Sequence, residues 1–464
     1  MNRRKGGDDC TLSARQYQET MKRLLICTPS HNLYGGVESI INDLCRHLPA
    51  RGWEATLALA KGTRFNDVER YRQTYPDIPA ITVDGTGGTR QSRRENLIRE
   101  IRRFQPDVVM NARIHDLFPV MTELKRRGGA PRFVATVRVY EPGYIHDVRN
   151  YQNIIDLCVV SGAIIAAACA RFSELPSERI VSIPGGVHPP DVPVLPRERP
   201  EVIRLGYVGR LDEGAKRIFD IPPLLALLER EGIPFRLVVA GAGPDEAGLR
   251  ERLAAQIRTG TVEFRGWLTR DQLYRELYPR LDCLIHCAEI EGVTISPREA
   301  MAHGVVPVIS RFVGLKSEGQ FRDGVNALTF PVGEVTNAAA CIRRLWSEPG
   351  LITGLSREAM LSQTGLYSFS GNLDAWAAAL DRCLELPLRQ GEVTAPDRED
   401  RGRLARLGVS PWLAQRFRDL AGEKPVYADP GSEWHTCDTR LPAWLKEEIE
   451  RFPYEIEGVA ARTP

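Results

Sequence analysis

The stretch Cys283–Pro307 reads CLIHCAEIEGVTISPREAMAHGVVP, and its pattern predicts a strand, a loop and a helix. Cys283–His286 is an apolar run short enough to be a buried strand. Ser296, Pro297 and Glu299 have the spacing of an N-cap, a first helical residue and the third position of a capping box. The loop therefore lies at the carboxyl end of a predicted parallel strand, where open α/β sheets bind ligands.

Two glutamates flank the predicted helix start, Glu291 in the loop and Glu299 in the first turn. The free N–H groups of a helix start attract anions, so an anionic ligand could dock there. A carboxylate beside it could accept hydrogen bonds from sugar hydroxyls. The same spacing also allows a plainer role, in which Glu299 only caps its own helix.

Length and composition exclude several classes of protein. The 464 residues are too many for one ordinary domain, and 43% hydrophobic with 26% charged residues is typical of a globular chain. A net charge of +2 gives no sign of nucleic-acid binding. No apolar run reaches the length of a membrane helix, and the first residues lack the apolar core of a signal peptide. The ten cysteines show no zinc-binding spacing, which favours reduced thiols in a cytoplasmic protein.

The first half of the chain alternates strand-like and helical segments, which predicts a parallel sheet with helices on both faces. We expect a flexible N-terminus over residues 1–20 and a Rossmann-like domain over residues 21–188. Its first strand leads into Gly35 and Gly36, where a helix begins. A glycine pair there lets backbone approach an anion closely, although a tight turn would need glycine as well.

A proline-rich linker over residues 189–200 separates this half from a second alternating series over residues 201–369. In the second series, Arg210 and Lys216 follow a strand end and precede a helix, a placement that suits binding of a diphosphate. A helix over residues 370–386 follows, and residues 387–464 form a C-terminal extension that is rich in aromatic side chains and of unknown role.

These motifs, in this order, resemble the retaining glycosyltransferases of family 4 with their E-x7-E signature. The resemblance implies an α/β protein with the GT-B fold, in which two Rossmann-like domains face each other across a cleft, and a last helix that crosses back to the first domain. It implies that Glu299 binds the ribose of a nucleotide-sugar donor and Glu291 lies by the donor sugar. Arg210 and Lys216 would neutralise the diphosphate. Further donor contacts are implied for Gly35, Gly36, Gly209, Gly266, Trp267, Gly292, Val293, Thr294 and Ile295.

The sequence departs from the family where a histidine usually follows the fifth strand of the first domain. Arg138 occupies that place, and His115 follows the preceding strand, so we expect one of them on the acceptor side of the cleft. The plainer alternative for each is an ordinary surface residue. No D-x-D motif stands where a metal would be needed, and we expect neither a metal nor a cofactor other than the donor substrate itself.

The expected function is transfer of a sugar from a nucleotide-diphosphate-sugar to a hydroxyl of a glycan, a lipid-linked or a small-molecule acceptor. A nucleotide-sugar epimerase of the same fold and a non-catalytic nucleotide-sugar-binding scaffold are the alternatives. Basic residues in the first half suggest peripheral contact with an anionic membrane at its inner face, although a solvated helix surface is the plainer explanation of them. They are Arg90, Arg93, Arg94, Arg99, Arg102, Arg103, Lys125, Arg126, Arg127 and Arg132.

Overall fold

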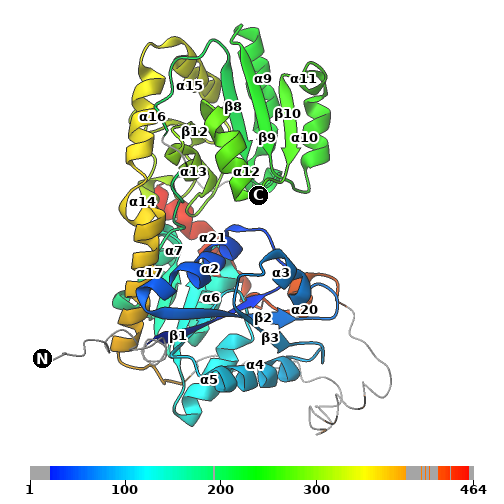
Figure 1. The fold of residues 1–464 in the computed structure, drawn as a ribbon, viewed down its shortest axis with the longest axis vertical. Coiled ribbons are helices and arrows are strands. Elements are labelled where there is room, and N and C mark those ends of the chain that lie inside the picture. Colours follow the sequence, from blue (N-terminus) through cyan, green and yellow to red (C-terminus); the bar gives the residue numbers. More distant parts are fainter. Residues whose placement is uncertain are drawn as a thin grey trace, which may run out of the picture.

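A computed structural model describes residues 21–191, 194–392, 427–438 and 440–458, together with residues 409, 413 and 417. The predicted flexible N-terminus, residues 1–20, lies outside the described residues. Two α/β domains are stacked along the long axis of the molecule (Figure 1). Every strand pairing within the two sheets is parallel, as the alternating pattern predicted.

The first domain contains a seven-stranded sheet in the order β3-β2-β1-β4-β5-β6-β7. Its strands are β1 (Lys22–Pro29), β2 (Trp53–Lys61), β3 (Ala80–Asp84), β4 (Val108–Asn111), β5 (Arg132–Val137), β6 (Leu157–Val160) and β7 (Ile180–Ser182). Its helices are α2 (Gly36–His47), α3 (Val68–Thr74), α4 (Arg90–Phe104), α5 (Leu117–Arg127), α6 (Pro142–Tyr151) and α7 (Ala163–Phe172).

The second domain contains a six-stranded sheet in the order β10-β9-β8-β11-β12-β13. Its strands are β8 (Ile203–Val208), β9 (Phe235–Ala240), β10 (Val262–Gly266), β11 (Cys283–His286), β12 (Val306–Ser310) and β13 (Leu328–Phe330). Its helices are α8 (Glu213–Lys216), α9 (Ile221–Arg230), α10 (Glu246–Arg252), α11 (Ala254–Arg258), α12 (Arg270–Gln272), α13 (Ser296–Ala302), α14 (Leu315–Glu318), α15 (Val335–Ser347) and α16 (Leu351–Leu361).

Alternating apolar side chains of the central strands explain why helices cover both faces of the first sheet. In β1, Leu25 packs into a core with residues of α4 and α5, whereas Ile26 packs into the core on the other face with residues of α2. Helix α17 (Phe369–Glu385) adds the buried Trp376 to that second core, so the last helix of the resemblance does return to the first domain. Figure 1 shows it descending from the second domain along the first.

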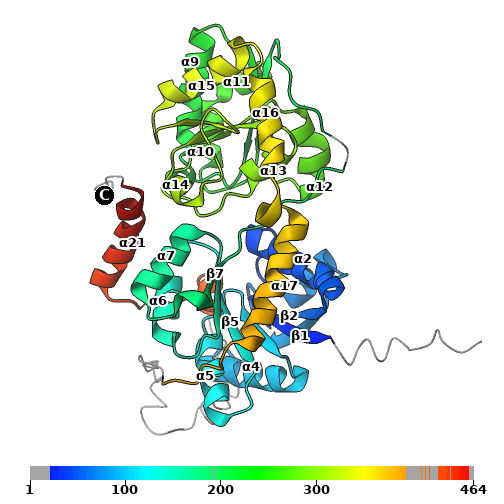
Figure 2. The ribbon, with the colours of Figure 1, turned by 90° about the vertical axis from the view of Figure 1, so that its left-hand side faces the viewer.

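The C-terminal extension packs against the body of the protein in its described part. Short helix α20 (Pro430–Glu433) precedes Trp434, which is fully buried in the core of the first domain and donates its indole N–H to Lys61 O at 3.1 Å. Helix α21 (Ala443–Glu457) lies beside α6 and α7 (Figure 2), where Tyr140 donates to Ile449 O at 2.7 Å. Among the described residues, no helix is both long and apolar enough to cross a bilayer.

The predicted basic surface is smaller than the sequence suggested. Arg93 and Lys125 are buried, in ion pairs with Asp116 and Asp156 respectively. Arg94 also lies inside, near Asp116, and Arg132 is half-buried and donates to Leu384 O at 2.9 Å. Exposed arginines remain on α4 and α5, at Arg99, Arg102, Arg103, Arg126 and Arg127.

Candidate active site

A cleft of about 700 Å³ lies between the two domains. Loops at the carboxyl ends of strands from both sheets form its walls, because the two sheets turn those edges toward each other. It brings together most of the residues that the sequence singled out: Gly35, Gly36, Gly209, Arg210, Lys216, Trp267, Glu291, Val293, Thr294, Ile295 and Glu299.

Lys216 and Glu291 form an ion pair in this cleft. Lys216 ends the short helix α8, whose N-cap Asp212 accepts from Ala215 N at 3.2 Å. Burial, reinforced by the positive charge of Arg210, lowers the pKa of Lys216 to about 8. The carboxylate of Asp212 acts in the opposite direction on this pKa. Arg210 pairs with Asp212 and leaves 64% of its side chain exposed, so it is free to turn toward a ligand.

Glu299 is held by two tyrosines. Its carboxylate accepts from Tyr278 Oη at 2.9 Å and from Tyr274 Oη at 3.4 Å. Burial raises the pKa of this carboxyl, while the hydrogen bond from Tyr278 opposes the rise. The carboxylate therefore faces the cleft on a fixed support.

The predicted capping box is wrong. Helix α13 takes Ile295 as its N-cap, with no side-chain cap. Ile295 already has helical backbone angles, φ −90° and ψ −53°, so Ser296 falls inside the first turn. Its hydroxyl donates instead to Val208 O at 2.8 Å, which ties the helix to the end of β8. Glu299 is thereby released from the plainer role of capping its own helix.

The glycine pair lies against the second domain, beside the start of α13. Gly35 is the N-cap of α2, with extended backbone angles, and the helix points its start into the cleft. A Cβ on Gly36 would lie 3.2 Å from Ile295 Cδ1 of the second domain. Beside this contact, the rings of Tyr34 and Trp267 meet across the cleft with centroids 4.3 Å apart.

Two predicted donor glycines lie just outside the cleft lining. Gly266 has φ +63°, and its carbonyl accepts from Gly241 N at 2.7 Å, which joins the ends of β10 and β9. Gly292 faces the first domain, where an added Cβ would lie 3.5 Å from Ser161 Oγ. Both glycines therefore support the cleft wall without lining the cleft.

The expected acceptor-side roles of His115 and Arg138 do not fit their positions, since neither is among the described residues that line the cleft. His115 is buried under the C-terminal extension, with its Nδ1 2.9 Å from Asp147 Oδ1. Arg138 donates to Ile183 O at 2.6 Å, and burial lowers its pKa to about 10. A position just after a strand does not reveal whether the side chain points into the domain interior or into the cleft.

Sequence reasoning missed a polar bridge across the cleft. His188 Nε2 lies 3.0 Å from Asp43 Oδ2, and Arg270 of the second domain lies 3.3 Å from the same oxygen. His188 also stacks on Phe369, with ring centroids 3.6 Å apart. Single residues in separate loops carry no motif, so only the packing of the two domains reveals the bridge.

The sequence also did not predict the contacts that His286 and Arg113 make with acidic residues of the site. His286 Nε2 lies 3.7 Å from Glu291 Oε1, and burial, together with the charge of Lys216, holds its pKa well below the usual range. The ring is therefore neutral beside Glu291. Arg113 has φ +71° and pairs with Glu38, the acidic residue that follows the glycine pair. A non-glycine residue held in that conformation is strained, which is common near functional sites.

Comparison with known families assigns both halves of the chain. Residues 34–190 match the model described as Glycosyltransferase Family 4, and residues 203–348 match the model described as Glycosyl transferases group 1. The comparison with curated proteins gives no match.

Solved structures share the fold at low sequence identity. A lipopolysaccharide outer core galactosyltransferase, WaaB, aligns with a TM-score of 0.60 and 15% identity over 78% of this chain and 99% of its own. Anabaena HepE, in complex with UDP and glucose, gives a TM-score of 0.61 and 15% identity over 78% and 100%. Sucrose-phosphate synthase from Thermosynechococcus elongatus gives 0.62 and 15% over 78% and 99%.

Proposed function

Since the chain is a family 4-like glycosyltransferase with the GT-B fold, we propose that it moves a sugar from a uridine-diphosphate sugar to an acceptor hydroxyl with retention of configuration. The observation that carries the proposal is the convergence of Arg210, Lys216, Glu291 and Glu299 in one interdomain cleft. The uridine donor is proposed because HepE has been solved with UDP and with UDP-glucose.

We assign each group a part that its position allows. Glu299, fixed by Tyr278, accepts hydrogen bonds from the ribose hydroxyls. The diphosphate takes the place of Glu291 as the partner of Lys216, and Arg210 turns from Asp212 to join it. Glu291, once released, accepts a hydroxyl of the donor sugar.

The reaction then needs charge stabilisation more than a nucleophile. The acceptor oxygen bonds to the anomeric carbon on the face from which the diphosphate leaves. As the bond from that carbon to the diphosphate breaks, a phosphate oxygen takes the proton of the acceptor hydroxyl. Lys216 and Arg210 stabilise the negative charge that gathers on the leaving group. We assign the cationic role to these two side chains rather than to a metal ion.

A donor screen tests the proposal. Release of UDP is measured for a panel of UDP-sugars, with and without candidate glycan, lipid-linked and small-molecule acceptors. We expect release that depends on acceptor, and a loss of about a hundredfold or more in Lys216→Ala. The exposed Lys446→Ala on α21 is the matched control and should keep full turnover.

Other outcomes would point elsewhere. Release of UDP together with a free sugar that is epimerised at a ring carbon, and with no transfer product, would identify an epimerase. Tight UDP-sugar binding without release, under every acceptor, would identify a binding scaffold. Turnover of Lys216→Ala within a few-fold of the wild-type enzyme would remove Lys216 from the mechanism.

Peripheral contact with an anionic membrane is part of the proposal only for the remaining arginines of α4 and α5, the two helices that lie together on the first domain (Figure 1). Their attraction to lipid would be screened within about 10 Å at physiological salt. Cosedimentation with anionic but not neutral vesicles at low salt is the expected result, and its absence would leave acceptors that are not membrane-borne.

A further inference from the structure

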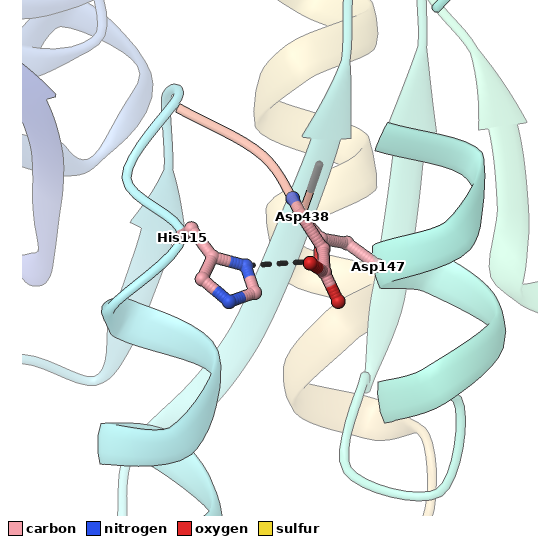
Figure 3. A group of neighbouring side chains, drawn as sticks. All are labelled: His115, Asp147 and Asp438. Carbon is pink, nitrogen blue, oxygen red and sulfur yellow. Dashed lines mark hydrogen bonds and ion pairs between the residues drawn. The ribbon is translucent and has the colours of Figure 1, made fainter. Parts of the chain in front are cut away.

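Outside the cleft, three side chains from distant parts of the chain converge (Figure 3). His115 follows β4, Asp147 lies in α6, and Asp438 belongs to the C-terminal extension. One donor atom from each lies within 4.8 Å of the others. The closest pair is His115 Nδ1 and Asp147 Oδ1, at 2.9 Å. Helical or strand spacing does not produce this group, because only the packing of the extension completes it.

The cluster is almost entirely shielded from solvent. His115 and Asp147 are 1% and 0% exposed, and the side chain of Asp438 is 12% exposed. Two carboxylates this close, out of water, are costly unless positive charge balances them.

The other polar contacts of the cluster come from the backbone and side chains of neighbouring residues. Asp147 Oδ2 accepts from Asp438 N at 3.2 Å, and Asp438 Oδ1 accepts from Arg440 N at 2.9 Å and Arg440 Nε at 3.3 Å. His146 Nδ1 lies 3.5 Å from Asp438 Oδ2. His115 Nδ1 and Asp147 Oδ1 face each other as an ion pair at 2.9 Å. Among the described residues, the other ring nitrogen of His115, Nε2, has no hydrogen-bond partner although it is buried.

We propose that His115, Asp147 and Asp438 bind one divalent transition-metal ion, which fastens the C-terminal extension to the first domain. One imidazole nitrogen and two carboxylate oxygens are ligands that Zn²⁺ accepts, at about 2.0–2.2 Å. Asp438 is the most exposed of the three, and metal binding would require its carboxylate to move to within that distance of the ion. His146 lies beside it as a candidate fourth ligand. This role is structural and separate from the transfer reaction.

The alternative is a bare ion-pair network, with a protonated His115 paired to Asp147 and Arg440 paired to Asp438. Metal and proton compete for the same His115 nitrogen, so the two arrangements exclude each other there. Binding of the ion also makes stability depend on its concentration, because metal held only by the folded chain shifts the folding equilibrium.

The test uses full-length protein without a polyhistidine tag, dialysed against EDTA and then against metal-free buffer. Equilibrium dialysis with Zn²⁺ should find one tightly bound ion per chain. At a free Zn²⁺ concentration about a hundredfold above its Kd, the melting temperature should rise by at least about 3 °C. Asp438→Asn should lose the bound ion and the rise. The exposed Glu447→Gln on α21 removes one negative charge elsewhere on the extension and should keep both.

A second measurement guards against a poorly folded variant. Co²⁺ bound to the wild-type protein should show visible ligand-field bands and no intense near-ultraviolet thiolate band, which separates this site from one built on the neighbouring Cys437. The proposal is overturned if no ion binds the wild-type chain. It is also overturned if folded Asp438→Asn binds Zn²⁺ as well as the wild type, or if a thiolate band appears.

Discussion

Lys216 carries a charge that the enzyme can lose within an accessible pH range. Its pKa, lowered to about 8 mainly by burial, means that the free enzyme holds a growing fraction of neutral lysine as pH rises past that value. A neutral amine cannot stabilise a diphosphate leaving group. We therefore expect kcat/KM for the donor, which reports the free enzyme, to fall on the alkaline side of about pH 8.

Lys216→Arg separates this cause from others. Arginine keeps its charge throughout the range, so the variant should be less active at pH 7 but should lose the alkaline fall. Profiles of kcat/KM between about pH 6 and 10 decide the matter. An unchanged alkaline limb in the arginine variant would assign the titration to another group.

Glu299 offers a second residue-level prediction. Because it does not cap α13, Glu299→Gln should leave the melting temperature nearly unchanged. If the carboxylate binds the ribose, the substitution should weaken UDP binding about tenfold, since a hydrogen bond to a charged group contributes roughly 1.5–3 kcal/mol. Isothermal titration calorimetry measures the UDP affinity of the wild-type and Glu299→Gln proteins. Tyr278→Phe removes only the hydroxyl that supports Glu299 and should weaken binding less; equal affinity in all three proteins would reject the ribose role.

The residue scale also shows the limit of sequence reasoning. The motif placed Lys216, Glu291 and Glu299 in one cleft, because each lies in the loop or short helix that follows a parallel strand, and the carboxyl ends of parallel strands share an edge. It failed at Ser296, where the helix begins one residue earlier than the capping pattern requires, and at His115, where the side chain turns inward. Both outcomes depend on tertiary contacts that spacing does not encode.

At the scale of elements, α20 holds a loop of the first domain in place. The Glu433 carboxylate accepts four backbone N–H groups, from Thr63 at 2.5 Å, Arg64 at 2.9 Å, Phe65 at 3.0 Å and Asn66 at 2.9 Å. Burial alone would raise the pKa of Glu433, but these bonds and the Asn66 side chain leave it below its usual value. Asn66 in turn accepts from Ser30 N at 3.0 Å, beside the loop that leads to the glycine pair.

Removing this carboxylate should therefore destabilise the first domain. We expect Glu433→Ala to lower the free energy of unfolding by about 3 kcal/mol, because several buried N–H groups lose a charged acceptor. Urea denaturation measures it. The contribution should be present above the ordinary pKa of a glutamate and should be lost as pH falls through the lower folded value. Asp429→Ala, which removes only the N-cap of α20, is the milder comparison. If Glu433→Ala changed the free energy of unfolding by less than about 0.5 kcal/mol, the loop would not depend on this carboxylate for its stability.

The strands and helices could be predicted from the sequence, whereas the place where the extension docks could not. Strands buried on both faces and amphipathic helices such as α4 carry their period in their own residues. The extension is rich in aromatic side chains, and Trp434 among them is buried, as such residues usually are. Its docking place could not be predicted, because Glu433 binds backbone groups that any sequence would present.

At the scale of the whole molecule, α14 of the second domain joins both the first domain and the extension. Glu318 at its end approaches Gly162 so closely that a Cβ there would overlap the carboxylate, which lies against the start of α7. From the other side, Glu457 of α21 accepts from Ser317 N at 2.9 Å and Lys316 N at 3.2 Å. The sequence predicted α17 as the link between domains, but these contacts have no motif.

Glu318 makes the contact between domains sensitive to pH. Burial raises its pKa to about 7 against the start of α7, whereas an open molecule would expose it and restore a value near 4.5. The closed arrangement thus binds more protons than the open one. Its stability is full below about pH 4.5, declines as pH rises between the two values, and is constant above about pH 7. Small-angle scattering of the free enzyme should therefore show a larger radius of gyration at pH 7.5 than at pH 5.5. Glu318→Gln, which cannot ionise, should stay compact at both. A wild-type radius that does not change with pH, or a glutamine variant that expands as the wild type does, would place the control of closure elsewhere.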